Sequence, residues 1–155
     1  MKSRHVLAAV LITATVGAAS GANPYLPLWE HIPDGEPYLF DDPDVPGKKR
    51  VYIYGSHDML KDQYCGTDLV VWSASPDSLN QWRYDGVILE SATDANGNLL
   101  HPYGEGDVLF APDVTEVTLR GGVKRYFLIP NNQAGPRNSM IAMSNRPDGP
   151  FKVIN

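Results

Sequence analysis

Short runs of β-forming residues alternate with turn signals along most of the chain. Beyond residue 22, apolar and aromatic positions gather in short stretches, and proline, glycine, asparagine and aspartate fill the intervals. No window of ten or more residues in this part shows the 3.6-residue stripe of an amphipathic helix. The pattern therefore predicts an all-β fold, with strands over 38–40, 50–56, 68–75, 82–89, 108–119, 124–129, 140–144 and 151–154.

The order of these predicted strands repeats once. Lys-Arg-Val-Tyr at 49–52 is echoed by Lys-Arg-Tyr-Phe at 124–127, and a second echo links 72–77 with 143–148. Each copy holds about four strands, and tandem four-stranded units are typical of β-propeller blades. The repeat therefore predicts a β-propeller, and a plain β-sandwich with coincidental turns is the alternative.

Two blades do not close a propeller ring. Propellers usually contain four to eight blades, so the strand edges and inter-blade faces of two blades alone would stay exposed. We expect blade 1 at about 34–91 and blade 2 at about 107–155, within a domain that covers 23–155. We therefore expect this chain to be the N-terminal part of a larger protein whose remaining blades are absent here.

The first 22 residues have the composition of a secretory signal peptide. Lys2 and Arg4 precede a run of small and apolar residues at 6–19, and Ser-Gly-Ala follows at 20–22. This order marks a cleaved export signal, and the apolar run is short for a membrane span. We expect a secreted or periplasmic protein that does not bind the membrane after cleavage; an anchoring or disordered N-terminus is the alternative.

Charge and cysteine content limit the classes of partner and chemistry. Removing residues 1–22 takes away two basic residues and no acid, so the formal charge moves from −5 to −7. An acidic surface disfavours nucleic acid and anionic membranes as partners. Cys65 is the only cysteine, so no internal disulfide can form, and we expect this thiol to be buried. No Cys and His cluster has metal-ligand spacing.

Two carboxylates stand beside a proline at the edge of a predicted strand. Asp34 lies between Pro33 and Gly35. Pro33 fixes the direction of the backbone and Gly35 permits a sharp bend, as a tight turn requires. Asp113 follows a proline within the predicted strand 108–119. We expect this pair of acids to sit at equivalent strand mouths of successive blades and to organise the functional site. Pro-Asp is also ordinary turn material in this chain, as at 76–77 and 147–148, so a turn-only role is the alternative for each acid.

Four segments resemble glycoside hydrolase family 43. They cover 23–37, 51–58 (Val-Tyr-Ile-Tyr-Gly-Ser-His-Asp), 109–114 (Leu-Phe-Ala-Pro-Asp-Val) and 144–151. The resemblance spans essentially all of 23–155 and implies a five-bladed β-propeller. It implies inverting hydrolysis of O-glycosidic bonds in arabinose- or xylose-containing glycans of the plant cell-wall type. It implies no required cofactor, and a structural calcium in the central channel is an open expectation without assigned ligands.

The resemblance also gives each acid a role. Asp34 matches the general base, and Asp113 matches the carboxylate that tunes the general acid and orients it. The general acid itself, a glutamate in this family, matches no residue of this chain. We therefore expect the chain alone not to hydrolyse glycans at a useful rate. The base and the acid of an inverting enzyme stand about 6.5–9.5 Å apart, and a third carboxylate nearby raises the pKa of the acid by like-charge repulsion.

Three further residues are candidates for contact with substrate. Phe110 stands where many relatives carry a larger aromatic side chain, and Glu36 is placed to line the channel. His57 follows the predicted strand 50–56, where a solvated loop is the alternative. Tyr38 is expected only to pack. The core is expected to hold the three tryptophans, Trp29, Trp72 and Trp82.

Three functions are open from the sequence. They are a secreted family 43 glycosidase, a non-catalytic glycan-binding propeller module and an unrelated β-sandwich adhesion domain. The first two predict that the acid-bearing strands lie side by side, innermost in adjacent sheets, whereas the third does not.

Overall fold

The computed structural model describes residues 25–58, 65–91, 108–132 and 140–154, which form two four-stranded antiparallel sheets and no helix. The first sheet has the order β1 (Glu36–Asp41), β2 (Lys49–Ser56), β3 (Asp68–Ala74), β4 (Arg83–Glu90). The second has the order β5 (Leu109–Thr118), β6 (Lys124–Asn132), β7 (Ala142–Ser144), β8 (Lys152–Val153). The predicted all-β fold with two four-stranded units is confirmed.

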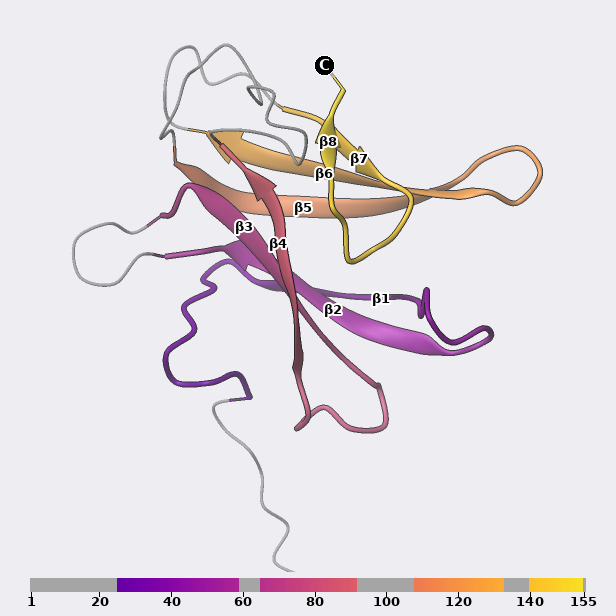
Figure 1. Cartoon of the computed structure of the whole chain (residues 1–155), viewed down its shortest axis with the longest axis horizontal. Coiled ribbons are helices and arrows are strands. Elements are labelled where there is room, and N and C mark those ends of the chain that lie inside the picture. Colours follow the sequence, from indigo (N-terminus) through magenta and orange to yellow (C-terminus); the bar gives the residue numbers. More distant parts are fainter. Residues whose placement is uncertain (1–24, 59–64, 92–107, 133–139, 155) are drawn as a thin grey trace, which may run out of the picture.

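The two sheets lie against each other, and the second sheet covers the first (Figure 1). β5 packs against β2 and β3. The acid-bearing first strands, β1 and β5, each form one edge of their sheet. The exact blade boundaries stay a prediction, and the predicted signal peptide at 1–22 lies outside the described residues. Within the described ranges, no helix is long and apolar enough to cross a membrane.

β6 differs most from the sequence prediction, because it continues through Pro130 to Asn132. Proline lacks an N–H and normally ends a strand or sits beside a bulge. Here the β5–β6 register shifts between Phe110 and Asp113, and Pro130 lies opposite that irregularity, where no partner is paired with it. At the bulge no hydrogen bond from residue 130 is needed, so the missing N–H of Pro130 costs the sheet nothing.

A single hydrophobic core fills the space between the sheets. It is built by fourteen buried side chains: Phe40, Tyr52, Tyr54, Leu69, Val71, Ile88, Leu89, Leu109, Val114, Tyr126, Leu128, Met140, Ala142 and Phe151. The ring of Phe40 meets the edge of Tyr126 across the sheets at a centroid distance of 5.2 Å. Both sheets supply side chains to this core, so each sheet depends on the other for burial.

Of four predictions for the core, two hold, one holds only in part and one is wrong. Cys65 is buried and free, and Trp72 is 4% exposed, as predicted. Trp82 is only half-buried. Trp29 is 65% exposed, because it lies in the irregular segment before β1 and only leans on Trp72, with ring centroids 5.9 Å apart.

Hydrogen bonds join the two sheets at several points. The hydroxyl of Tyr54, which is fully buried on β2, donates to the carbonyl oxygen of Pro147 at 2.5 Å. The N–H of Phe151 donates to the carbonyl oxygen of Ile88 at 2.9 Å. The turn before β8 is thereby fixed to the first sheet.

Replacing Tyr54 with phenylalanine tests this junction. We expect Tyr54→Phe to lower the free energy of unfolding by about 1–3 kcal/mol, because the buried carbonyl of Pro147 loses its donor. Urea unfolding of the purified chain measures the change. Tyr84→Phe, at a tyrosine that is 47% exposed, is the control and should change stability little. Equal effects of the two substitutions would contradict the proposed importance of this bond.

Candidate active site

Asp34 lies in a strained turn immediately before β1. Its φ of 58° is in the left-handed region, which costs a residue other than glycine about 1–3 kcal/mol. Ser56, the last residue of β2, donates its N–H to the carbonyl oxygen of Pro33 at 3.0 Å. The hydroxyl of Ser56 lies 3.3 Å from Oδ2 of Asp34. The last residue of β2 therefore holds the strained turn through its N–H and its hydroxyl.

Gly55 allows this turn to lie directly on β2. A Cβ at position 55 would stand 2.7 Å from the carbonyl oxygen of Pro33 and 2.9 Å from Cγ2 of Ile32. Distances this short are excluded for real side chains, so the backbone of 32–35 approaches β2 only because residue 55 is glycine. The position of Asp34 thus depends on a missing side chain in the neighbouring strand.

The hydroxyl of Ser56 also reaches the second sheet. Ser56 is fully buried, and its Oγ accepts the N–H of Ala111 at 2.9 Å. Ala111 has a φ of 40°, which is also left-handed, and it lies two residues before Asp113 on β5. A single serine therefore contacts both backbone segments that carry the predicted acids.

The strand register relates Asp113 to Glu36. The sequence repeat places β6 75 residues after β2, which makes Ile129 equivalent to Tyr54. Glu36 pairs with Tyr54 in the first sheet, and Asp113 pairs with Ile129 in the second. Glu36, at the start of β1, is therefore the equivalent of Asp113.

Counting residues back from this pair matches Asp34 with Ala111, although neither residue is itself paired in its sheet. Both residues lie two positions before the equivalent pair and both have left-handed backbones. The sequence-based expectation that Asp34 and Asp113 occupy equivalent strand mouths is therefore wrong. Asp113 lies two residues further along its strand than Asp34 does, and loops of different length hide this difference in the sequence. Only the pairing of strands shows how much of the spacing comes from the strand and how much from the loops.

Asp113 is held by a tyrosine of the first sheet. The hydroxyl of Tyr38 donates to Oδ1 of Asp113 at 2.5 Å, and this hydroxyl also lies 2.8 Å from Oε2 of Glu36. Burial raises the pKa of Tyr38, and its hydrogen bonds to Asp113 and Glu36 raise it further. The expectation that Tyr38 only packs is wrong, because alternation along β1 gave no sign of a partner in the second sheet.

His57 lies between two carboxylates. Its Nδ1 is 2.8 Å from Oδ1 of Asp68, and its Nε2 is 3.4 Å from Oε1 of Glu30. The hydrogen bond with Asp68 raises the pKa of His57, although burial opposes this shift. The side chain of Glu30 is 2% exposed and also accepts the indole N–H of Trp72 at 2.7 Å. The cluster fixes the segment before Asp34 onto the first sheet; contact of His57 with substrate stays a prediction.

Asp58 stands close to the candidate base. Burial, and next the negative charge of Asp34, raise the pKa of Asp58. Its Oδ1 is buried without a hydrogen-bond partner among the residues described. Its N–H donates to the carbonyl oxygen of His31 at 2.9 Å, which ties it to the same N-terminal segment. Burial and the nearby charge of Asp34 therefore both disfavour the charged form of Asp58.

The predicted site residues therefore form a connected group in part. Glu36 and Asp113 share the hydroxyl of Tyr38, and Asp34 connects to β5 through Ser56. Phe110 is half-buried on β5, directly before the left-handed residue of that strand. The sequence did not reveal Ser56 or Tyr38 as members of the group, because both are ordinary strand residues in a period-2 pattern.

The described residues offer no metal centre. Within the described ranges, no group of three or more His, Cys, Asp or Glu side chains is arranged to hold an ion. The structural calcium suggested by the family resemblance stays a prediction.

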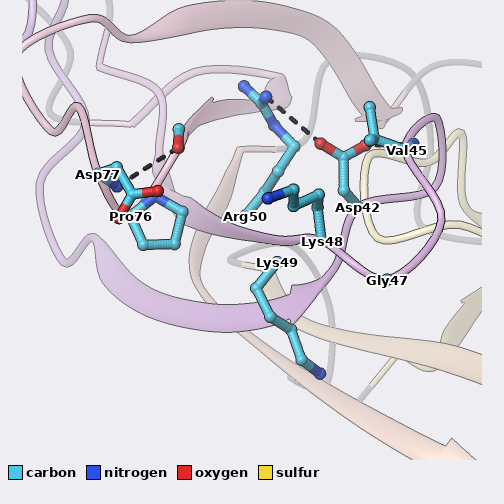
Figure 2. A pocket seen from close by; sticks show the side chains of 9 residues that line it. Asp42, Val45, Gly47, Lys48, Lys49, Arg50, Pro76 and Asp77 are labelled. Carbon is cyan, nitrogen blue, oxygen red and sulfur yellow. Dashed lines mark hydrogen bonds and ion pairs between the residues drawn. The ribbon is translucent and has the colours of Figure 1, made fainter.

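A surface pocket lies at the opposite end of β1 and β2 from Asp34. Figure 2 shows its basic residues at 48–50 beside Asp42 and Asp77. The guanidinium of Arg50 pairs with Asp42 at 3.6 Å and donates to the hydroxyl of Ser73 at 3.1 Å. The charge of Arg50 is therefore already compensated by Asp42 in this pocket.

The fold and the connected acids together define two consecutive blades of a β-propeller with carboxylates where the blades meet. No protein-family model matches the chain. A xylosidase/arabinosidase from Thermoclostridium stercorarium is 48% identical over 107 residues, which are 68% of this chain and 19% of that protein. The name of this relative agrees with the resemblance to glycoside hydrolase family 43.

Solved structures agree on the fold. RS223 β-xylosidase matches with a TM-score of 0.52 and 21% identity, over 77% of this chain and 35% of its own. The GH43_1 enzyme from Xanthomonas citri, complexed with xylotriose, matches with a TM-score of 0.53 and 19% identity, over 81% of this chain and 32% of its own. The chain thus spans about a fifth of the curated relative and about a third of each structure.

Adding a methyl group at Gly55 tests how the Asp34 turn is held. We expect Gly55→Ala to displace residues 32–35 and to lower the free energy of unfolding by about 1–3 kcal/mol, the usual cost of overpacking. Urea unfolding measures stability, and the backbone NMR shifts of Asp34 report the displacement. Unchanged shifts together with a stability change below about 0.5 kcal/mol would show that the turn does not need the close approach.

The carboxylates around His57 predict a pH-dependent contribution to stability. Because the folded-state pKa of His57 is raised, its contribution is complete below the unfolded value of about 6.5. The contribution is lost as the pH rises through the folded-state value, where the imidazole loses its proton. We expect the stability difference between wild type and His57→Gln to be largest near about pH 5.5–6.5 and to shrink at higher pH.

Thermal unfolding over a pH series measures this difference. His31→Gln, at an exposed histidine of the same N-terminal segment, is the matched control and should show no such trend. A difference between wild type and His57→Gln that is constant across the series would mean that the two carboxylates do not act on His57.

Proposed function

We propose that this chain supplies part of the catalytic centre of an inverting glycosidase that acts on xylose- or arabinose-containing glycans. The observation that carries the proposal is the strained turn of Asp34, anchored to a serine that also holds the strand of Asp113. Backbone strain of this kind is concentrated at functional sites. The name of the 48% identical relative, xylosidase/arabinosidase, supports the choice of sugars.

In the proposed reaction, Asp34 acts as the general base. Its carboxylate takes a proton from water, and the resulting nucleophile attacks the anomeric carbon from the face opposite the leaving group, so the configuration inverts. Asp34 is exposed, so water can reach it.

Asp113 has an electrostatic role in this proposal. The leaving oxygen takes a proton from a general acid, and a carboxylate near that acid raises its pKa and keeps it protonated until the bond breaks. Asp113 is exposed on β5 with one oxygen bound to Tyr38, so its other oxygen is available to orient a neighbouring acid. We assign the general acid to no residue of this chain, and we propose that the chain alone is inactive.

We also propose export of the protein, with residues 1–22 removed as a signal peptide. Two basic residues, an apolar run and a small-residue cleavage site support this proposal. Expression in a bacterial host followed by mass spectrometry of the periplasmic product should give a mature chain that begins at Asn23. A full-length product confined to the cytoplasm would contradict export.

A chimera tests the catalytic roles. Residues 23–155 replace the matching region of the Thermoclostridium stercorarium xylosidase/arabinosidase, and hydrolysis of nitrophenyl xyloside and arabinofuranoside is measured. We expect Asp34→Asn to reduce kcat by about 10²–10⁴-fold, the usual contribution of a general base, while xylo-oligosaccharide binding is retained. Asp77→Asn, in another Pro-Asp turn, is the matched control and should leave kcat unchanged.

The outcomes separate the functions left open by the sequence. Unchanged turnover in Asp34→Asn would remove Asp34 from the mechanism. A chimera that binds xylo-oligosaccharides but never hydrolyses them would favour the non-catalytic binding module. Release of xylose or arabinose by the unfused 155-residue chain would contradict its proposed inactivity.

A further inference from the structure

We propose that Ser56 and Tyr38 are positioning residues, which together hold Asp113 in a fixed relation to Asp34 across the junction between the two sheets. The catalytic meaning of this proposal rests on the proposed function, whereas the contacts themselves do not. Neither residue is assigned to bind or transform the substrate. Each acts through the backbone or the carboxylate that it holds.

The hydroxyl of Ser56 has both of its hydrogen-bonding capacities in use. It accepts the N–H of Ala111 at 2.9 Å and donates toward Oδ2 of Asp34 at 3.3 Å. A serine hydroxyl carries one proton, and Ser56 is shielded from water, being 0% exposed. Both bonds therefore form only when the Asp34 turn and β5 are in place together, so movement of either segment leaves a buried polar group unpaired.

The peptide unit held by Ser56 controls the direction of Asp113. The amide of Asn131 on β6 donates to the carbonyl oxygen of Ala111 at 3.1 Å, so Ala111 is held on its N–H side by one sheet and on its C=O side by the other. The register irregularity between Phe110 and Asp113 lies at this point. A slip of one residue there would turn Asp113 to the opposite face of β5.

The hydroxyl of Tyr38 fixes the side chain of Asp113 directly. It has one proton and two carboxylate oxygens within reach, at 2.5 Å for Asp113 and 2.8 Å for Glu36. The shorter contact assigns the proton to the bond with Asp113. The Tyr38 ring is stacked on Phe40 with an interplanar angle of 2° and leans on Tyr54 at 6.0 Å. The hydroxyl is therefore held in place before it meets the carboxylate.

Orientation, more than stability, is what the Tyr38–Asp113 bond provides. The bond is exposed, so water can replace either partner and the net contribution to folding is small. Its specific consequence is that one oxygen of Asp113 is occupied and pointed toward the first sheet.

NMR on the whole 155-residue chain, with tyrosine labelled at Cζ, tests the tyrosine contact without any assay of activity. We expect Asp113→Asn to move the ionisation of Tyr38 to lower pH, because the carboxylate that disfavours the phenolate is gone. Glu116→Gln is the matched control, since Glu116 accepts from Tyr126 at 3.0 Å. That variant should move Tyr126 and leave Tyr38 unchanged. An identical Tyr38 titration in wild type and Asp113→Asn would overturn the proposal.

Amide hydrogen exchange in the same chain tests the serine contact. We expect Ser56→Ala to speed the exchange of the Ala111 N–H at least tenfold, because that N–H loses its acceptor. Ser73→Ala, at another fully buried serine, should not change it. Equal protection of Ala111 in wild type and Ser56→Ala would overturn the role of Ser56. Asp113→Asn changes an exposed side chain and should fold. The NMR experiment on Tyr38 therefore tests the Tyr38–Asp113 contact even if Ser56→Ala does not fold.

Kinetics of the chimera then connect the contacts to catalysis. We expect Tyr38→Phe and Ser56→Ala to lower kcat about tenfold and to leave KM within twofold, whereas Tyr126→Phe and Ser73→Ala change neither. Equal effects of the test and control substitutions would overturn the positioning role. An inactive chimera with the expected NMR changes would refute the proposed function and leave the proposed contacts standing.

Discussion

The close approach of the Asp34 turn to β2 is the constraint on which the candidate site depends. Gly55 leaves the space for it, since a Cβ there would stand 2.7 Å from the carbonyl oxygen of Pro33. Ser56 follows immediately and holds the turn through its N–H and its hydroxyl. The left-handed backbone of Asp34 is tolerated because these contacts leave it no relaxed alternative. The consequence is a carboxylate presented from a rigid strand end and not from a free loop.

Both sheets have a residue with a left-handed backbone near the start of their first strand, but the side chains at these two positions differ. Each first strand has a left-handed residue two positions before the pair formed by Glu36 and Asp113. The first sheet places an acid, Asp34, on that left-handed residue, whereas the second sheet places Ala111 there. The acids of adjacent blades therefore differ by two residues in height along their strands. A tandem repeat can thus supply acids at different depths around one axis without a change of fold.

Charge pairing fixes the segment that leads to the site. His57 joins the buried carboxylate of Glu30 to Asp68, and Glu30 also accepts from Trp72. A buried carboxylate without such partners would be strongly unfavourable, so the N-terminal segment can dock in few other ways. Asp58, whose N–H donates to the carbonyl oxygen of His31, is also tied to this segment. Burial and then the charge of Asp34 raise the pKa of Asp58. The surroundings of Asp34 therefore limit its position.

The sequence by itself determined the all-β class, the tandem four-stranded units, most strand positions and the acids at 34 and 113. These features are local, since period-2 alternation, turn residues and motif spacing are written in neighbouring positions. Tertiary structure alone decided that Glu36 is the equivalent of Asp113, that Trp29 is exposed, and that Tyr38 and Ser56 reach the second sheet. Strand register and contacts between sheets join residues 55 to 75 positions apart, and no local pattern encodes which distant partner a strand residue will meet.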